Sequence, residues 1–282
     1  VMVALQLGVV AMLAELGVRP TAVAGHSLGE IAAAAVSGVL SVAEAMRVAH
    51  HRGRLMQRAT GRGAMAAVAL TVSELEAEFA EAGVLSVAAD NARDSAVVSG
   101  EPAAVDAALA ALKARGVRST KLKVDYAFHS HQLDGVLVEL EAALGTVVVS
   151  AATMPVYSSV TGALAESTAF TAAYWPRQVR GRVEFRSAMA AMLEAGERHF
   201  VEVGPHPVLS VYVHDAVAAA GVAADASAVV ATLRRGAPEM EAVLGTAAGL
   251  YSAGHEVEWA GVAGDAGMRA PVALPTYSWD EK

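Results

Sequence analysis

The pattern of apolar and polar positions differs between two regions of this chain and predicts a different architecture for each. Toward both ends, alanine- and valine-rich segments with helical spacing are separated by short apolar runs that predict buried strands. In these outer parts the pattern predicts helices over 1–16, 28–37, 43–59, 132–144, 185–194 and 240–252 and from Val208 onward, and strands over 22–24, 156–158 and 199–203. Strands that alternate with helices are typical of an α/β fold with a parallel sheet.

Between Gly63 and Val124 the pattern changes to shorter segments. It predicts strands over 64–70, 85–91, 95–99 and 119–124 and helices over 73–82 and 101–114. The order β-α-β-β-α-β is that of a ferredoxin-like subdomain. We therefore expect a large α/β-hydrolase-like subdomain with a parallel sheet over 1–61 and 125–260, interrupted by a smaller ferredoxin-like subdomain over 62–124, with a cleft between the two.

Composition narrows the classes of partner. The 282 residues are 55% hydrophobic and carry a formal net charge of −8, without a dense run of Lys and Arg. This balance argues against nucleic acid or an anionic membrane as the main partner. The absence of cysteine excludes disulfides, cysteine nucleophiles and thiolate metal sites, and it agrees with a reducing compartment, so we expect a cytoplasmic protein with no metal centre.

The first stretch of the chain, over 1–18, is apolar enough to raise the question of a signal peptide or a membrane span. It lacks a basic leading region and contains Gln6 and Glu15, which favours a buried helix. It also begins inside a helical pattern with no cap and no initiator methionine. We expect the chain to be a fragment of a longer protein.

The segment Gly25-His26-Ser27-Leu28-Gly29 lies between a predicted strand and a predicted helix. The G-x-S-x-G pattern in this context is typical of a nucleophile elbow, in which a strained turn exposes the serine hydroxyl. Glycines on either side remove Cβ atoms that would collide there. The helix that follows directs its free N–H groups at any oxyanion, and the N–H of Leu28 is the natural first donor. The alternative is an ordinary turn in which the serine only caps the helix.

Further segments, in order along nearly the whole chain, accompany the elbow. They lie at 24–30, Arg52, 63–67, 86–91, 97–100, 126–130 and 200–207. With these segments the chain resembles the acyltransferase domains of modular polyketide synthases and the malonyl-CoA:acyl carrier protein transacylases of fatty acid synthesis. Residues 274–277 look like the linker that follows such domains in polyketide synthases, so 261–282 is expected to be that linker.

The resemblance implies a reaction and a role for several residues. Ser27 would attack the thioester of an acyl-coenzyme A, and the acyl group would then pass to the phosphopantetheine thiol of an acyl carrier protein. His129 would take the serine proton and return it to the leaving thiol. The family orients this histidine with a main-chain carbonyl, which we expect near Gly204-Pro205; His206 is a weaker rival base. Expected partners are the carrier protein and a neighbouring ketosynthase domain, with no bound cofactor.

Arg52 distinguishes substrate classes in the family, because an arginine here clamps the free carboxylate of malonyl-type substrates. Without the resemblance, Arg52 would be one of several solvated cations, together with Arg47, Arg54 and Arg58.

The choice of extender follows the four residues that end in His129, with Tyr-Ala-Ser-His usual for methylmalonyl and His-Ala-Phe-His usual for malonyl. Here Tyr126 and Phe128 form a hybrid, and Gln132 is of the methylmalonyl type. Leu28 fits neither form. The resemblance favours methylmalonyl slightly over malonyl.

Two departures from the family pattern leave other functions open. No Gly-Gln-Gly segment precedes Gln6, so an N-terminal strand and the second oxyanion donor are expected to be missing, and Gln178-Val179-Arg180 stands where Asn-Leu-Arg is usual. A serine hydrolase or esterase on a related scaffold would use a late histidine, for which the candidates are His206, His214 and His255. A non-catalytic fragment of a synthase is the third reading.

Overall fold

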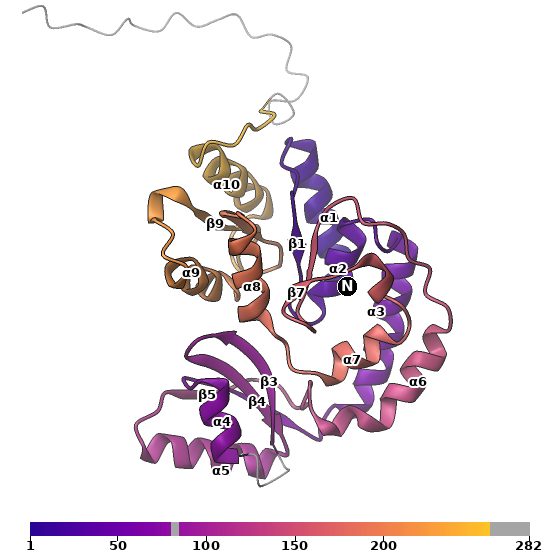
Figure 1. Ribbon diagram of the computed structural model, residues 1–282, viewed down its shortest axis with the longest axis vertical. Helices are drawn as coiled ribbons and strands as arrows, with labels where there is room; N and C mark the ends of the chain where they lie inside the picture. The colour runs from indigo at the N-terminus through magenta and orange to yellow at the C-terminus, as the bar shows by residue number, and fades with distance from the viewer. Residues whose placement is uncertain (80–84, 260–282) are drawn as a thin grey trace, which may run out of the picture.

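A computed structural model describes residues 1–79 and 85–259. Figure 1 shows two parts: a small sheet with two helices on one side of it, and a larger part in which helices surround short strands. The expected linker over 261–282 and the end of the helix expected over 73–82 lie outside the described residues. Within the described ranges, no helix is both long and apolar enough to cross a membrane.

The small part has the ferredoxin-like order that the sequence predicts. Its elements are β2 (Ala64–Val68), α4 (Val72–Phe79), β3 (Leu85–Ala92), β4 (Ser95–Gly100), α5 (Pro102–Ala114) and β5 (Ser119–Lys121). The strands pair antiparallel in the order β3-β4-β2-β5. Leu75 of α4 and Leu112 of α5 are buried in one core with the strand residue Val98, so both helices cover the same face of the sheet. Strand β5 ends three residues earlier than predicted.

The large part contains two small sheets. Its strands are β1 (Val23–Ala24), β6 (Val156–Ser158), β7 (Ala163–Leu164), β8 (His199–Glu202) and β9 (Ala228–Ala231). Strand β1 pairs parallel with β6, β6 pairs antiparallel with β7, and β8 pairs parallel with β9. The parallel pairs agree with the predicted α/β class, whereas β7 and β9 were not predicted. Strand β7 has two exposed residues and so lacks a periodic pattern.

Helices enclose these strands. They are α1 (Met2–Glu15), α2 (Gly29–Val36), α3 (Val42–Met56), α6 (Asp134–Leu144), α7 (Tyr174–Arg180), α8 (Phe185–Glu194), α9 (Ser210–Ala219) and α10 (Glu239–Ser252). Two predicted helices end or begin in a short 3-10 turn. The turn Gln57–Ala59 forms the end of the helix predicted over 43–59, and the turn His131–Leu133 forms the start of the one predicted over 132–144. Helix α7 was missed because it contains Pro176, which a helix tolerates only in its first turn. Ile31 of α2, Leu55 of α3 and Trp175 of α7 are fully buried in one core.

The two parts meet along strand β3. Asp90 N–H donates to the carbonyl of Val183 and Val183 N–H donates to the carbonyl of Ala88, each at 2.9 Å. A second hydrophobic cluster joins Ala88 and Val97 of the small sheet to Phe185 and other residues of α8. The segment between α7 and α8 therefore extends the small sheet while it belongs to the large part.

Candidate active site

Ser27 lies in the turn between β1 and α2, as the elbow pattern predicts. Its φ is +50°, in the left-handed region that non-glycine residues rarely adopt. A Cβ at Gly25 would lie 2.1 Å from the main-chain nitrogen of Glu30, so glycine is required there. At Gly29 a Cβ would meet nothing closer than 3.8 Å, so the expectation that both glycines avoid a collision is wrong for Gly29.

His129 faces Ser27 from the loop before α6. Its Nε2 lies 2.7 Å from Ser27 Oγ, and its Nδ1 lies 2.8 Å from the carbonyl oxygen of Gly181. Because a carbonyl only accepts, Nδ1 carries the proton and Nε2 accepts from the serine hydroxyl. The expected main-chain orienter is therefore present, but it is Gly181 after α7, and the expectation of the Gly204-Pro205 loop is wrong. His206 instead accepts a hydrogen bond from the N–H of Arg235.

The imidazole of His129 is held neutral. Burial lowers the pKa of His129 to about 3, with the positive charge of Arg52 as the next cause. A neutral imidazole at neutral pH can accept the serine proton. The main chain at His129 has a φ of +58°, in the left-handed region. Ser27 and His129 are the non-glycine residues with positive φ among those that the structure describes.

Arg52 of α3 is buried beside Ser27. It is 5% exposed, and its Nη2 donates to Ser27 Oγ at 3.1 Å. Burial lowers the pKa of Arg52 to about 10, opposed by the negative charge of Glu30, so the guanidinium stays charged at neutral pH. Arg47, Arg54 and Arg58 form ion pairs with Glu44 or Glu139, whereas no carboxylate in the described part of the chain forms one with Arg52. Arg52 therefore differs from these solvated cations.

The N–H of Leu28 is available for an oxyanion. Helix α2 begins just after it, and the next two N–H groups bond to the carbonyls of His26 and Ser27. Across residues 1–79 and 85–259, no group accepts a hydrogen bond from Leu28 N–H. A free N–H at a helix start beside a nucleophile is suited to stabilise an oxyanion.

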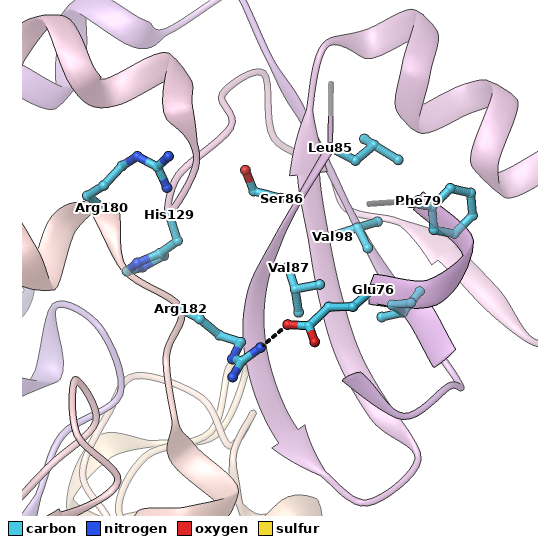
Figure 2. A pocket seen from close by; sticks show the side chains of 10 residues that line it. Glu76, Phe79, Leu85, Ser86, Val87, Val98, His129, Arg180 and Arg182 are labelled. Atoms are coloured by element: carbon cyan, nitrogen blue, oxygen red, sulfur yellow. Dashed lines mark hydrogen bonds and ion pairs between the residues drawn. The ribbon is translucent and has the colours of Figure 1, made fainter. Parts of the chain in front are cut away.

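One cavity lies between the two parts and has a volume of about 280 Å³. Figure 2 shows His129, Arg180 and Arg182 along one wall, facing side chains from the small sheet such as Ser86 and Val87. Arg182 forms an ion pair across the cavity with Glu76 of α4 at 2.7 Å. The interrupted chain order predicts a cleft lined by the elbow on one side and by the residues just after Val124 on the other. His129 lines this cavity, as expected for that second side, whereas no residue of the elbow does.

A second cavity, of about 290 Å³, is lined by Arg52. Leu28, Met56, Tyr126 and Phe128 are among its lining residues. The rings of Tyr126 and Phe128 are stacked, with centroids 3.8 Å apart and planes inclined by 13°. Gln132, the other predicted selectivity residue, lines neither cavity.

Sequence reasoning missed three polar groups around the site. Gln178 of α7 donates to the carbonyl of Ser27 and accepts from Arg52, and His26 bonds to Asn91 of β3 at 2.8 Å. Gln178 was visible only as a departure from the family pattern, and His26 only as part of the elbow. In the described residues, no three His, Cys, Asp or Glu side chains are placed to hold a metal ion.

Comparisons with known proteins agree with this geometry. A family model described as acyl transferase domain matches residues 1–257. The spectinabilin polyketide synthase system protein NorC of Streptomyces orinoci is 46% identical over 225 residues, which are 78% of this chain and 10% of NorC. Erythronolide synthase EryA2 of Saccharopolyspora erythraea is 39% identical over 281 residues, which are 97% of this chain and 8% of EryA2. The chain thus spans a small share of the length of these relatives.

Solved structures give the same picture. The acyltransferase domain from the second module of the salinomycin polyketide synthase has a TM-score of 0.88 and 36% identity, covering 97% of this chain and 64% of that one. The crystal structure of MCAT from Streptococcus pneumoniae has a TM-score of 0.74 and 30% identity, covering 86% of this chain and 79% of that one.

Proposed function

Since the chain belongs to the acyl transferase domain family and is an acyltransferase of the modular polyketide synthase type, we propose that it moves a carboxyacyl extender unit from coenzyme A to an acyl carrier protein. The acyl group is held in between as an ester on Ser27. The observation that carries this proposal is the buried guanidinium of Arg52 beside the hydroxyl of Ser27, which forms an ion pair with no carboxylate among residues 1–79 and 85–259. The relatives are parts of long synthases, which supports a carrier protein and a ketosynthase as neighbouring domains.

The first half-reaction forms the acyl-serine. Ser27 Oγ attacks the thioester carbonyl while its proton passes to Nε2 of His129, 2.7 Å away. The C–S bond then breaks, and His129 returns the proton to the thiolate of coenzyme A. The N–H of Leu28 stabilises the negative charge on the carbonyl oxygen in between.

The second half-reaction reverses these steps with another thiol. The phosphopantetheine thiol of the carrier protein gives its proton to His129 and attacks the ester carbonyl. The C–O bond breaks, and the proton returns to Ser27 Oγ. The cavity of about 280 Å³ between the two parts is lined by His129, so we propose it as the path by which the thiol arm reaches the base.

Arg52 selects the class of acyl group. Its guanidinium borders the second cavity. In the described ranges, no residue accepts a hydrogen bond from its Nη1. A planar, bidentate cation matches a free carboxylate, which favours malonyl-type units over neutral acyl groups.

The second cavity supports methylmalonyl slightly over malonyl. The stacked rings of Tyr126 and Phe128 form part of the wall of this cavity. Ala49 and Gly53 on α3 line the same cavity with little side-chain volume. The discrimination expected from one methyl group is about 1–3 kcal/mol.

Intact-protein mass spectrometry after brief incubation with malonyl-, methylmalonyl- and acetyl-CoA tests the function. We expect a mass gain of one carboxyacyl group that is absent in Ser27→Ala, and in Arg52→Ala a selective loss of both dicarboxylic adducts while acetyl transfer persists. Adding a carrier protein should move the adduct to its thiol faster than water releases it. Release to water alone would favour a hydrolase, and a folded chain that never acylates would contradict catalysis.

The extender preference is tested with equal concentrations of malonyl- and methylmalonyl-CoA in competition. We expect methylmalonyl to lead by about tenfold, at the lower end of what one methyl group supplies. Phe128→Ser, which removes the ring from the wall, should increase the lead of methylmalonyl. A decrease would show that the stacked wall does not limit the α-substituent.

A further inference from the structure

One buried side chain contacts two elements of the site at once. The amide of Gln178 donates from Nε2 to the main-chain carbonyl of Ser27 at 2.6 Å and accepts at Oε1 from Nε of Arg52 at 3.3 Å. The helix that carries Gln178 is capped at its C-terminus by Gly181, whose carbonyl oxygen lies 2.8 Å from Nδ1 of His129. The side chain of Gln178 therefore meets the proposed nucleophile and the proposed carboxylate clamp, and its helix leads into the residue that orients the base.

The surrounding structure fixes Gln178 in place. It is 2% exposed and lies on α7 between Trp175 and Gly181, whose own carbonyl orients His129. Trp175 and Tyr174 in the first turn of the helix are buried in the large core. A side chain anchored in this way has few alternative rotamers, so its two hydrogen bonds are preorganised.

We propose that Gln178 is a positioning residue that aims the guanidinium of Arg52 at the substrate carboxylate and holds the strained turn at Ser27. This inference rests on the proposed selection of dicarboxylic acyl groups. By occupying Nε of Arg52, Gln178 directs the remaining edge of the guanidinium, with Nη1 and Nη2, toward Ser27 and the second cavity.

The neutrality of the amide is the important property. An amide oxygen orients the guanidinium but leaves its charge uncompensated for the ligand. A carboxylate at the same place would pair with Arg52 and compete with the carboxylate of the substrate. A carboxylate also lacks the N–H that Gln178 donates to the carbonyl of Ser27. Two acceptors would then face each other.

Two substitutions separate these roles. Gln178→Glu keeps the size and the acceptor but adds a negative charge, and Gln178→Met keeps the length but removes both hydrogen bonds. The readout is the ratio of acyl-serine formation rates with malonyl-CoA and with acetyl-CoA, measured by quench flow and mass spectrometry. We expect the ratio to fall by about tenfold or more in Gln178→Glu and by a smaller factor in Gln178→Met.

A double variant tests the route of the effect. In Arg52→Ala the ratio is already reduced, so adding Gln178→Met should not lower it further, because the two residues act through one contact. Arg177→Gln, an exposed position on the same helix, is the matched control and should leave the ratio unchanged. Circular dichroism and thermal unfolding establish that each variant is folded; if Gln178→Met does not fold, Gln178→Glu carries the test.

The outcomes separate the two proposals. A wild-type chain that accepts acetyl-CoA as readily as malonyl-CoA contradicts the proposed function, whatever the variants do. A wild type that prefers malonyl-CoA, with folded Gln178 variants that lose rate equally on both substrates, overturns the positioning role and leaves Gln178 as a packing residue only.

Discussion

At the scale of single residues, backbone strain is concentrated where the chemistry is proposed. Ser27 and His129 both have positive φ, which costs about 1–3 kcal/mol each for residues with a side chain. The surroundings enforce these conformations: Gly25 admits the close approach of Glu30, and Gln178 bonds to the carbonyl of Ser27. The strain fixes the hydroxyl and the imidazole before a substrate arrives.

The acid limb of catalysis should lie well below the ordinary range of histidine. Because burial lowers the pKa of His129 to about 3 from a usual 6.5, the base stays neutral as the pH falls through 6.5. We expect kcat/KM for acylation by acetyl-CoA, which does not need Arg52, to show no inflection near pH 6.5. In Arg52→Ala one cause of the lowered pKa is gone, so the acid limb should move to higher pH.

Unfolding in acid limits how far the pH can be lowered in this measurement. The unfolded chain binds a proton on His129 at higher pH than the folded chain does. The free energy of unfolding therefore decreases as the pH falls below 6.5. Circular dichroism at each pH identifies where unfolding begins. An inflection near 6.5 that Arg52→Ala does not move would contradict a buried neutral base.

At the scale of elements, the loop of His129 is shaped by a glycine from another segment. A Cβ at Gly63, just before β2, would lie 2.3 Å from the main-chain nitrogen of Ala127. The N–H groups of Gly61 and Gly63 both donate to the carbonyl of Asp125. The start of the small sheet therefore fixes the start of the loop that carries Tyr126, Phe128 and His129.

Gly63→Ala should displace this loop. We expect acylation to fall by about 100-fold, because a small misplacement of the base is costly, and the free energy of unfolding to fall by about 1–3 kcal/mol. Urea unfolding and the acylation rate measure the two effects. Gly135→Ala, in the first turn of α6 where a Cβ would meet nothing within 4 Å, is the control and should be neutral or stabilising. Equal activity in both variants would contradict the close packing at Gly63.

Local patterns account for the elements that sequence reasoning located. The turn between β1 and α2 could be predicted because glycine spacing and a strand-to-helix change are local signals. The orienter of His129 could not be, because any residue offers a main-chain carbonyl, and Gly181 has no pattern that marks it. Similarly, the contact of Gln178 with Arg52 spans 126 positions, and periodicity within one element carries no information about such a contact.

At the scale of the whole molecule, the position of the small part governs the width of the cleft. Besides the main-chain bonds of β3 to Val183, Arg186 at the start of α8 forms a bidentate pair with the buried Asp90, in which Nε donates to Oδ1 at 3.1 Å and Nη2 donates to Oδ2 at 2.8 Å. Asn91, the next residue, bonds to His26 in the elbow. One end of strand β3 is thus tied both to α8 and to the neighbour of Ser27, which couples the small part to the catalytic turn.

Arg186→Ala should loosen the contact between β3 and α8 while the chain stays folded. Removing one partner leaves a buried carboxylate acceptor of Asp90 unsatisfied, which costs about 1–3 kcal/mol of stability. We expect KM for acyl-CoA to rise, since the walls of the cleft are no longer held in register, and hydrogen exchange at the amide of Asp90 to accelerate. Arg115→Ala breaks the exposed pair with Glu78 inside the small part and should leave both stability and KM nearly unchanged, because solvent screens such a pair. If both variants leave KM and exchange at Asp90 unaltered, the main-chain bonds to Val183 alone hold the two parts together, and the ion pair has no part in shaping the cleft.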